Sequence, residues 1–147
     1  MPGVESLRAN QYYANPRNVF WRIMGVVLGF SENASYNEKI ASLKANRIAL
    51  WDVMHTCERP GSLDANIVRH TIEPNDFVSL FQENSHIAQI LFNGVTAEKE
   101  YIRRVLPNLS GEARDFKLLR LPSTSSAMAR MSLQEKLILW SNAIKGA

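Results

Sequence analysis

The fold is decided by Ile87-Ala88-Gln89-Ile90-Leu91-Phe92-Asn93-Gly94, a compact apolar run that ends on a turn dipeptide. A short apolar run bounded by a turn signal is typical of a buried strand. A second strand is predicted over residues 116–121, where Pro122 stops it, and a helix over residues 97–106, which ends before Pro107. Strands separated by helices predict a short central parallel sheet with helices on both faces, an α/β/α sandwich of three layers.

Capping signals predict the helices that flank these strands. Asn15 as N-cap and Pro16 at the first helical position predict a mostly buried helix that runs to about Leu28 and stops at Gly29. Two Ser-x-x-Glu capping boxes predict a helix over residues 36–45 and a terminal helix from residue 133. The remaining predicted elements are a short strand over residues 48–53 and short helices over residues 63–69 and 76–83.

Length and composition limit the class of protein. The chain has 147 residues, of which 46% are hydrophobic, and this suits one domain with a core. No apolar run reaches the roughly 18 residues of a membrane span, so we expect no membrane partner. The single cysteine, Cys57, excludes an internal disulfide framework and favours a reducing, cytoplasmic setting.

The charge distribution is a weak pointer to a partner. The net charge is +3, with a basic beginning and end and an acidic middle of the chain. If the two ends meet in the fold, they form a positive face suited to a polyanion. An ordinary solvated surface is the alternative.

Familiar catalytic sets are missing. The histidines, His55, His70 and His86, are widely spaced and follow no metal-ligand pattern, so each is interpreted as a surface or capping residue. There is no P-loop and no dinucleotide fingerprint. Cys57 has no indicated activating base. The residues alone therefore indicate no metal-ligand pattern and no nucleotide-binding motif.

The functional residues are expected in loops at the carboxyl ends of the strands, where α/β sheets bind ligands. These loops are the start of the chain, Asn93-Gly94 and residues 122–131. Tyr13 and Asn18 lie beside the predicted helix start, either facing a ligand or serving as a core-edge aromatic and a capping amide. The serines that follow Pro122 suit phosphate contacts or form a plain polar loop.

Three segments in order resemble the uracil-DNA glycosylase superfamily, and most closely its hypoxanthine-DNA (deoxyinosine) glycosylase family. The first segment is Met1-Pro2-Gly3 followed by Tyr12-Tyr13-Ala14-Asn15-Pro16-Arg17-Asn18-Val19-Phe20-Trp21. The second is Ile90-Leu91-Phe92-Asn93-Gly94, and the third is Leu121-Pro122-Ser123-Thr124-Ser125-Ser126. The stretches 49–53 and 61–64 are also similar to the hypoxanthine branch, so the resemblance spans nearly the whole chain.

The resemblance implies hydrolysis of the N-glycosidic bond of a deaminated base that is flipped out of DNA. It implies Asn18 as the catalytic amide, which orients water or holds the leaving base. It also implies base contacts from Gly3, Tyr13 and Asn93. Contacts to DNA are implied for Ser123, Thr124, Ser125, Met128 and Arg130, with Met128 filling the vacated stack. We further expect a monomer and no metal.

Departures from the family pattern keep alternatives open. Met1 stands where mismatch-specific uracil glycosylases carry a water-positioning Asn, and Asn15 replaces the family's His. Family members have a strand ending in Gly-Ser before Met-Pro-Gly, so we expect residues 1–147 to form one glycosylase domain without that first strand. The alternatives are a mismatch-specific uracil or thymine glycosylase and a non-catalytic DNA-binding remnant.

Overall fold

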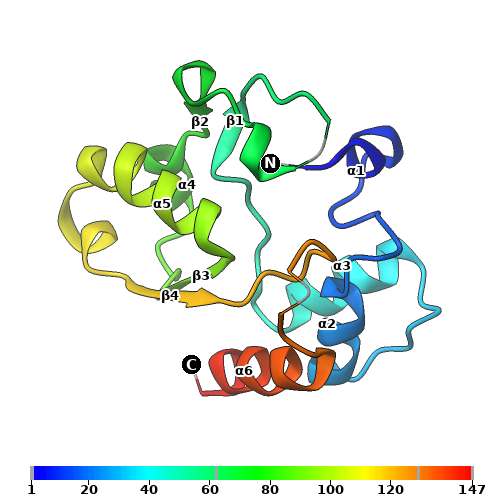
Figure 1. Ribbon diagram of the computed structural model, residues 1–147. Helices are drawn as coiled ribbons and strands as arrows, with labels where there is room; N and C mark the ends of the chain where they lie inside the picture. Colours follow the sequence, from blue (N-terminus) through cyan, green and yellow to red (C-terminus); the bar gives the residue numbers. More distant parts are fainter. Residues whose placement is uncertain (1, 62, 129, 147) are drawn as a thin grey trace. The chain divides into compact units, whose positions relative to one another are not determined.

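The computed structural model describes residues 2–61, 63–128 and 130–146, which divide into two compact units. Residues 52–123 form unit 1, and residues 2–51 together with 124–146 form unit 2. Each unit is described by itself (Figure 1). No helix in the described part of the chain is both long and apolar enough to cross a membrane.

Unit 1 is built on a pair of parallel strands. Strands β3 (Gln89–Asn93) and β4 (Lys117–Leu121) pair in register from Gln89 opposite Lys117 to Asn93 opposite Leu121. The crossover between them contains α5 (Val95–Arg104) and the 3-10 turns η3 (Leu106–Asn108) and η4 (Gly111–Arg114). The predicted α/β class with a short parallel sheet is therefore confirmed.

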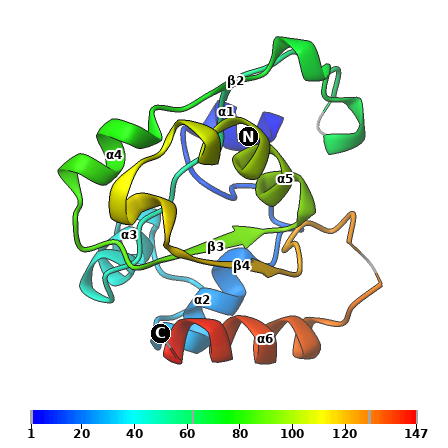
Figure 2. The ribbon, with the colours of Figure 1, turned by 90° about the vertical axis from the view of Figure 1, so that its left-hand side faces the viewer.

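The core of unit 1 lies between this sheet and two helices. Figures 1 and 2 show α4 (Phe77–Glu83) and α5 on the same face of the β3–β4 pair. Phe92 of β3 packs beside Tyr101 of α5, with ring centroids 5.1 Å apart, and Tyr101 meets Phe77 of α4 at 5.3 Å. All three side chains are buried, so the face of β3 that carries Phe92 contributes to the core of unit 1.

A second strand pair in unit 1 corrects one prediction. The strand predicted over residues 48–53 is wrong, because the strand is β1 (Met54–Thr56), antiparallel to β2 (Glu73–Pro74). The carbonyls of Asp52 and Val53 accept hydrogen bonds from the side chain and backbone of Asn75, at 2.8 and 3.0 Å. Asp52 and Val53 thus contact Asn75, which follows β2, and the paired strand begins at Met54. The turns η1 (Asp64–Asn66) and η2 (Arg69–Thr71) replace the short helix predicted over residues 63–69.

Unit 2 is helical and contains α1 (Val4–Ala9), α2 (Phe20–Leu28), α3 (Tyr36–Ala45) and α6 (Leu133–Lys145). Both predicted capping boxes are present, at the starts of α3 and α6. Phe20 of α2 meets Trp140 of α6 edge to face at 5.9 Å, and both are buried. The mostly buried α2 is confirmed, and Gly29 ends it with a φ of 81°.

The predicted start of α2 is wrong. Asn15 is not its N-cap: the helix begins at Phe20, and residues 15–18 form a turn that the Asn18 N–H closes on the Asn15 carbonyl at 2.9 Å. The Asn15 side chain accepts a hydrogen bond from the backbone N–H of Arg17, also at 2.9 Å. Pro16 therefore occupies the second position of a turn, where its fixed φ is equally suitable.

Candidate functional site

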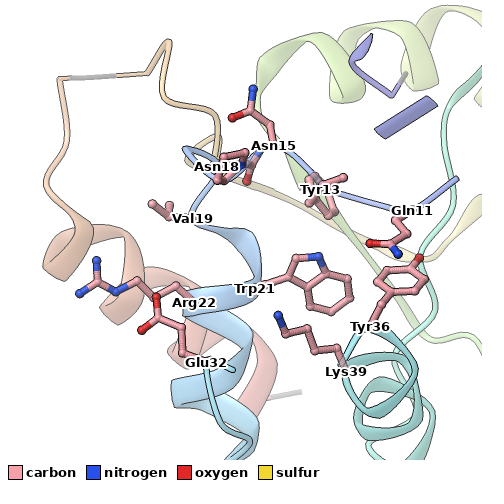
Figure 3. Close-up of a pocket in the computed structure, with 12 residues that line it drawn as sticks. Gln11, Tyr13, Asn15, Asn18, Val19, Trp21, Arg22, Glu32, Tyr36 and Lys39 are labelled. Carbon is pink, nitrogen blue, oxygen red and sulfur yellow. The ribbon is translucent and has the colours of Figure 1, made fainter. Parts of the chain in front are cut away.

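A pocket of about 340 Å³ opens in unit 2 beside the loop that precedes α2 (Figure 3). Tyr13 and Asn18 line it, together with Trp21 on the first turn of α2. Charged side chains of Arg22, Glu32 and Lys39 lie on its border. The pocket thus combines aromatic side chains with several polar and charged groups.

Tyr13 has an uncommon backbone conformation, with a φ of 53°. Hydrogen bonds hold the residues on both sides of it. The Tyr12 N–H donates to the Tyr36 hydroxyl, and the Ala14 N–H donates to the buried Ser6 hydroxyl, each at 3.1 Å. The Trp21 indole N–H also donates to the Tyr12 carbonyl at 2.9 Å. A bulky residue at positive φ is strained, and such strain concentrates at functional sites.

The Tyr13 ring is held in place from one side. It stacks on Phe20, with centroids 4.0 Å apart and planes inclined by 24°. Phe20 is itself buried and belongs to the core of unit 2. The ring is half-buried and lines the pocket, so an aromatic surface is presented there by a rigid support.

Of the two ends of the Asn18 side-chain amide, the oxygen is hydrogen-bonded to the backbone and the nitrogen is not bonded to any described residue. Its Oδ1 accepts the backbone N–H of Phe20 at 3.0 Å, which caps the first free N–H of α2. This contact fixes which end is oxygen, because an N–H group needs an acceptor. The Nδ2 group has no hydrogen-bond partner within the described residues and belongs to a side chain that lines the pocket. Asn18 thus precedes the helix, whereas the sequence placed it in the first turn.

A second group of predicted residues meets in unit 1, at the carboxyl ends of β3 and β4. The Gly94 N–H donates to the Leu121 carbonyl at 3.1 Å, directly after Asn93 has paired with Leu121. A Cβ on Gly94 would lie 3.0 Å from the Ser123 Cβ, and the φ of Gly94 is 98°. Only glycine permits both this conformation and this approach, so Gly94 packs directly against Ser123 at the ends of the two strands.

The serine-rich loop continues from Ser123 into unit 2. Thr124 is fully buried, and its carbonyl accepts the Val19 N–H at 3.1 Å. This bond joins the loop to the segment that carries Asn18. Met128 is 37% exposed and Arg130 is exposed.

The structure distributes the predicted site residues over both units. Asn93 and Ser123 lie in unit 1, whereas Gly3, Tyr13, Asn18, Thr124, Ser125, Met128 and Arg130 lie in unit 2. Tyr13 and Asn18 share the pocket, but Gly3 does not line it and instead begins α1. Met1, predicted to lack the water-positioning group, lies outside the described residues.

Sequence reasoning missed several residues. Trp21, Tyr36 and Lys39 line the pocket, and only the neighbouring Tyr13 and Asn18 had been singled out. Lys136 was also missed, although it is 4% exposed and its ammonium donates to the Met128 carbonyl at 3.0 Å. Its position four residues before Trp140 places it on the buried face of α6, which is the signal that could have identified it.

Side chains that could bind a metal ion form no cluster in the described residues. No group of three His, Cys, Asp or Glu side chains there could hold a metal ion. His55, His70 and His86 are exposed, as predicted.

Of three comparisons with known proteins, the two that found matches both point to DNA glycosylases. No model of a known protein family matches the chain. A hypoxanthine DNA glycosylase of Methanosarcina acetivorans is 41% identical over 125 residues, which cover 79% of this chain and 78% of that protein. A protein of the same name from Methanosarcina barkeri is 33% identical over 147 residues, covering 99% and 86%. The solution NMR structure of a candidate uracil DNA glycosylase from Methanosarcina acetivorans has a TM-score of 0.78 and 34% identity, covering 99% of this chain and 84% of that chain.

The structural match and the α/β architecture define the class, because this chain has a fold like that of the candidate uracil DNA glycosylase. The two Methanosarcina relatives then identify the family within this class. The chain belongs to the hypoxanthine DNA glycosylase family, and it is a DNA repair glycosylase, a hydrolase of N-glycosyl bonds that acts on DNA. The family resemblance stated from the sequence is confirmed.

Proposed function

We propose that this enzyme releases a deaminated base, hypoxanthine in first place, from DNA. The observation that carries the proposal is the Asn18 amide, whose Oδ1 is fixed on the Phe20 N–H while its Nδ2 group lacks a protein partner within the described residues. A donor held in this way can stabilise the negative charge that develops on a leaving base without reorganisation cost. The names of the two Methanosarcina relatives support hypoxanthine as the base.

Hydrolysis in this proposal places the charge on the departing base. The glycosidic bond breaks with its electron pair on the base nitrogen, water adds its oxygen to sugar C1′, and the water proton finally neutralises the base. The target base cannot react inside the stack, so it is flipped into a pocket. Tyr13 stacks on the flipped base, Asn18 donates to it, and Asn93 and Gly3 contribute further base contacts. The step uses no metal or organic cofactor.

DNA is held, in this proposal, by the serine loop and by charge. Ser123 and Ser125 contact the phosphates that flank the target, Arg130 adds a cation and Met128 fills the vacated stack. The phosphate contact expected for Thr124 is not part of this proposal, because that residue is fully buried and holds the loop through its carbonyl. Unit 2 supports this role because it carries nine Lys and Arg against four Asp and Glu, a net charge of +5. Unit 1 carries eight against ten, a net charge of −2.

We also propose that residues 1–147 act as one glycosylase domain that functions as a monomer in the cytoplasm. The single cysteine suits a reducing compartment. Light scattering after size exclusion tests the monomer, with a mass near 16.6 kDa expected and a dimer mass as the contradicting result. Fractionation of the cells that make the protein tests the location.

Base release from defined duplexes tests the function. The enzyme is incubated in excess over otherwise identical duplexes that carry deoxyinosine, deoxyuridine, a mismatched thymine or an undamaged pair, and the free base is quantified. We expect release of hypoxanthine to be fastest, with none from the undamaged duplex. Faster release of uracil or mismatched thymine would mean that this base, and not hypoxanthine, is the preferred substrate. Binding without any release would overturn the proposal.

A further inference from the structure

Lys136 is a buried cation for which the proposed function has no use. Its side chain lies inside unit 2 on α6, and the residue is only 4% exposed. Burial lowers the pKa of its ammonium below the ordinary value. Within the described residues its partner is the Met128 carbonyl, 3.0 Å from Nζ, and not a carboxylate. Burying an ammonium is costly unless it is well bonded, so this contact is an unusual way to fasten a loop.

The bond to Lys136 completes a small, closed turn. The Met128 N–H donates to the Ser125 carbonyl at 3.1 Å, and the Ala127 N–H donates to the Ser125 hydroxyl at 3.2 Å. At the other end, the buried Thr124 is tied to Val19. The backbone of residues 124–128 is therefore held at both ends, while the Met128 side chain stays more than a third exposed.

We propose that Lys136 is a positioning residue which, through its hydrogen bond to the Met128 carbonyl, holds the Met128 side chain ready to enter the DNA stack when the target base leaves it. This inference rests on the proposed function. An apolar wedge must keep its place against the stacked bases that resist it, and a mobile loop would first have to be ordered at an entropic cost. A charge-assisted hydrogen bond under low dielectric is a strong way to remove that mobility.

The test separates wedge insertion from the chemistry. Release of hypoxanthine is measured from a deoxyinosine duplex and from the corresponding single strand, which has no partner stack to invade. Binding to a duplex with 2-aminopurine beside the deoxyinosine reports unstacking as a rise in fluorescence. The variants are Lys136→Met, Lys136→Arg and Met128→Ala, and Lys145→Met is the control that removes an exposed lysine from the same helix.

We expect Lys136→Met to slow duplex release about tenfold or more, the effect of losing one charged hydrogen bond. Release from the single strand should be unchanged. The fluorescence rise should be lost in Lys136→Met and Met128→Ala, restored in Lys136→Arg and kept in Lys145→Met. The double variant Met128→Ala with Lys136→Met should be no slower than Met128→Ala alone, because both act on one step.

Other results overturn the inference. Equal losses on duplex and single strand, or additive losses in the double variant, would make Lys136 a structural residue. Circular dichroism measures the folded fraction of each variant. If Lys136→Met does not fold, Lys136→Gln is used in its place. If neither variant folds, Lys136 is a structural residue and the positioning role is excluded. If the wild-type protein releases no base from either substrate, the proposed function is wrong. If the wild-type protein also gives no fluorescence rise, this inference is wrong as well.

Discussion

Asn18 joins helix capping and the proposed catalysis in one side chain, and its two amide atoms allow these roles to be separated. Asn18→Asp retains an oxygen that accepts the Phe20 N–H, whereas it replaces the Nδ2 donor by a second acceptor. We expect it to slow hypoxanthine release by roughly 10²-fold or more, the effect of removing one preorganised donor. Single-turnover release, corrected for the folded fraction, measures this rate.

Asn18→Ala is the matched control, because it removes both atoms. It should show the same loss of rate and, in addition, lower the free energy of unfolding by about 0.5–2 kcal/mol, as expected for a lost cap. DNA affinity should change little in Asn18→Ala, since that substitution alters no charge, whereas the new carboxylate of Asn18→Asp should weaken it through repulsion from the phosphates. A normal corrected rate in Asn18→Asp would remove the Nδ2 group from the mechanism and leave Asn18 a capping residue.

Tyr13 provides the second test at this scale. Tyr13→Ala should weaken binding to deoxyinosine duplex by about 1–3 kcal/mol, the worth of one base–aromatic stack, and should affect undamaged duplex less. Tyr13→Phe retains the ring that stacks on Phe20 and should bind almost normally. Fluorescence anisotropy with both duplexes measures the difference, and equal losses on the two would count against stacking.

The hydroxyls of Tyr101 and Tyr36 differ in their hydrogen bonding, so replacing each tyrosine by Phe should change the stability in opposite directions. The Tyr101 hydroxyl is buried without a partner in the described part of the chain, and burial raises its pKa to about 12. Tyr101→Phe should therefore raise the free energy of unfolding by about 1–3 kcal/mol. Tyr36→Phe should lower it, because the Tyr36 hydroxyl accepts the Tyr12 N–H. Chemical denaturation of both variants measures the changes; destabilisation by Tyr101→Phe would indicate an unseen partner for its hydroxyl.

At the level of elements, the cap of α6 predicts a dependence of stability on pH. The hydrogen bonds from Ser132 hold the pKa of Glu135 below its ordinary value of 4.5. A carboxyl with a depressed pKa stabilises the folded state above its unfolded pKa, and this stabilisation is lost as the pH falls through its folded pKa. Ser132→Ala should thus lower the thermal midpoint most near neutral pH and less in acid.

The part of this loss that remains in acid comes from the Ser132 hydroxyl accepting the Glu135 N–H, which does not titrate in this range. Ser35→Ala removes the corresponding cap of α3, where Ser35 lowers the pKa of Glu38 in the same way, and should show the same trend. Thermal scans from about pH 3 to 7 test both variants. A loss that grows as the pH falls would contradict the assignment.

Elements with a local signal, such as a capping box or an apolar run, could be predicted from the sequence, whereas boundaries set by distant contacts could not. Both capping boxes were found because a Ser and a Glu three residues apart satisfy each other. The start of α2 was misplaced because Asn-Pro suits a helix start and a turn equally. The choice rests on distant bonds, such as Val19 N–H to the Thr124 carbonyl, more than a hundred residues away.

The same distinction applies to the site. Tyr13 and Asn18 were identified from their place in a motif, and the structure brings them to one pocket. Trp21 lies in the same motif but was given no role. Tyr36 and Lys136 carried no local signal of function, because a Tyr or a Lys in a helix is ordinary without knowledge of what faces it. The antiparallel pair β1–β2 escaped prediction for a related reason, since Asn75 sets its register across 22 residues from Val53.

At the scale of the whole molecule, charge separates the two units, as unit 2 is basic and unit 1 slightly acidic. DNA affinity that depends on released counterions falls with salt by a slope of about −0.9 for each phosphate contact. Arg17, Arg130 and the serine loop supply few such contacts, so we expect three to five, a log–log slope of about −3 to −4.5.

Titration of undamaged duplex binding from low to moderate salt gives this slope for the wild-type chain and two variants. Arg17 in unit 2 and Arg103 in unit 1 are both exposed, so each can be replaced by Ala at similar structural cost. Arg17→Ala should reduce the slope by about 1, the effect of one lost phosphate contact, and Arg103→Ala should leave it unchanged. An equal effect of the two substitutions would show that the cations which contact phosphates are not confined to the basic unit. A wild-type slope steeper than about −7 would show more phosphate contacts than Arg17, Arg130 and the serine loop can supply.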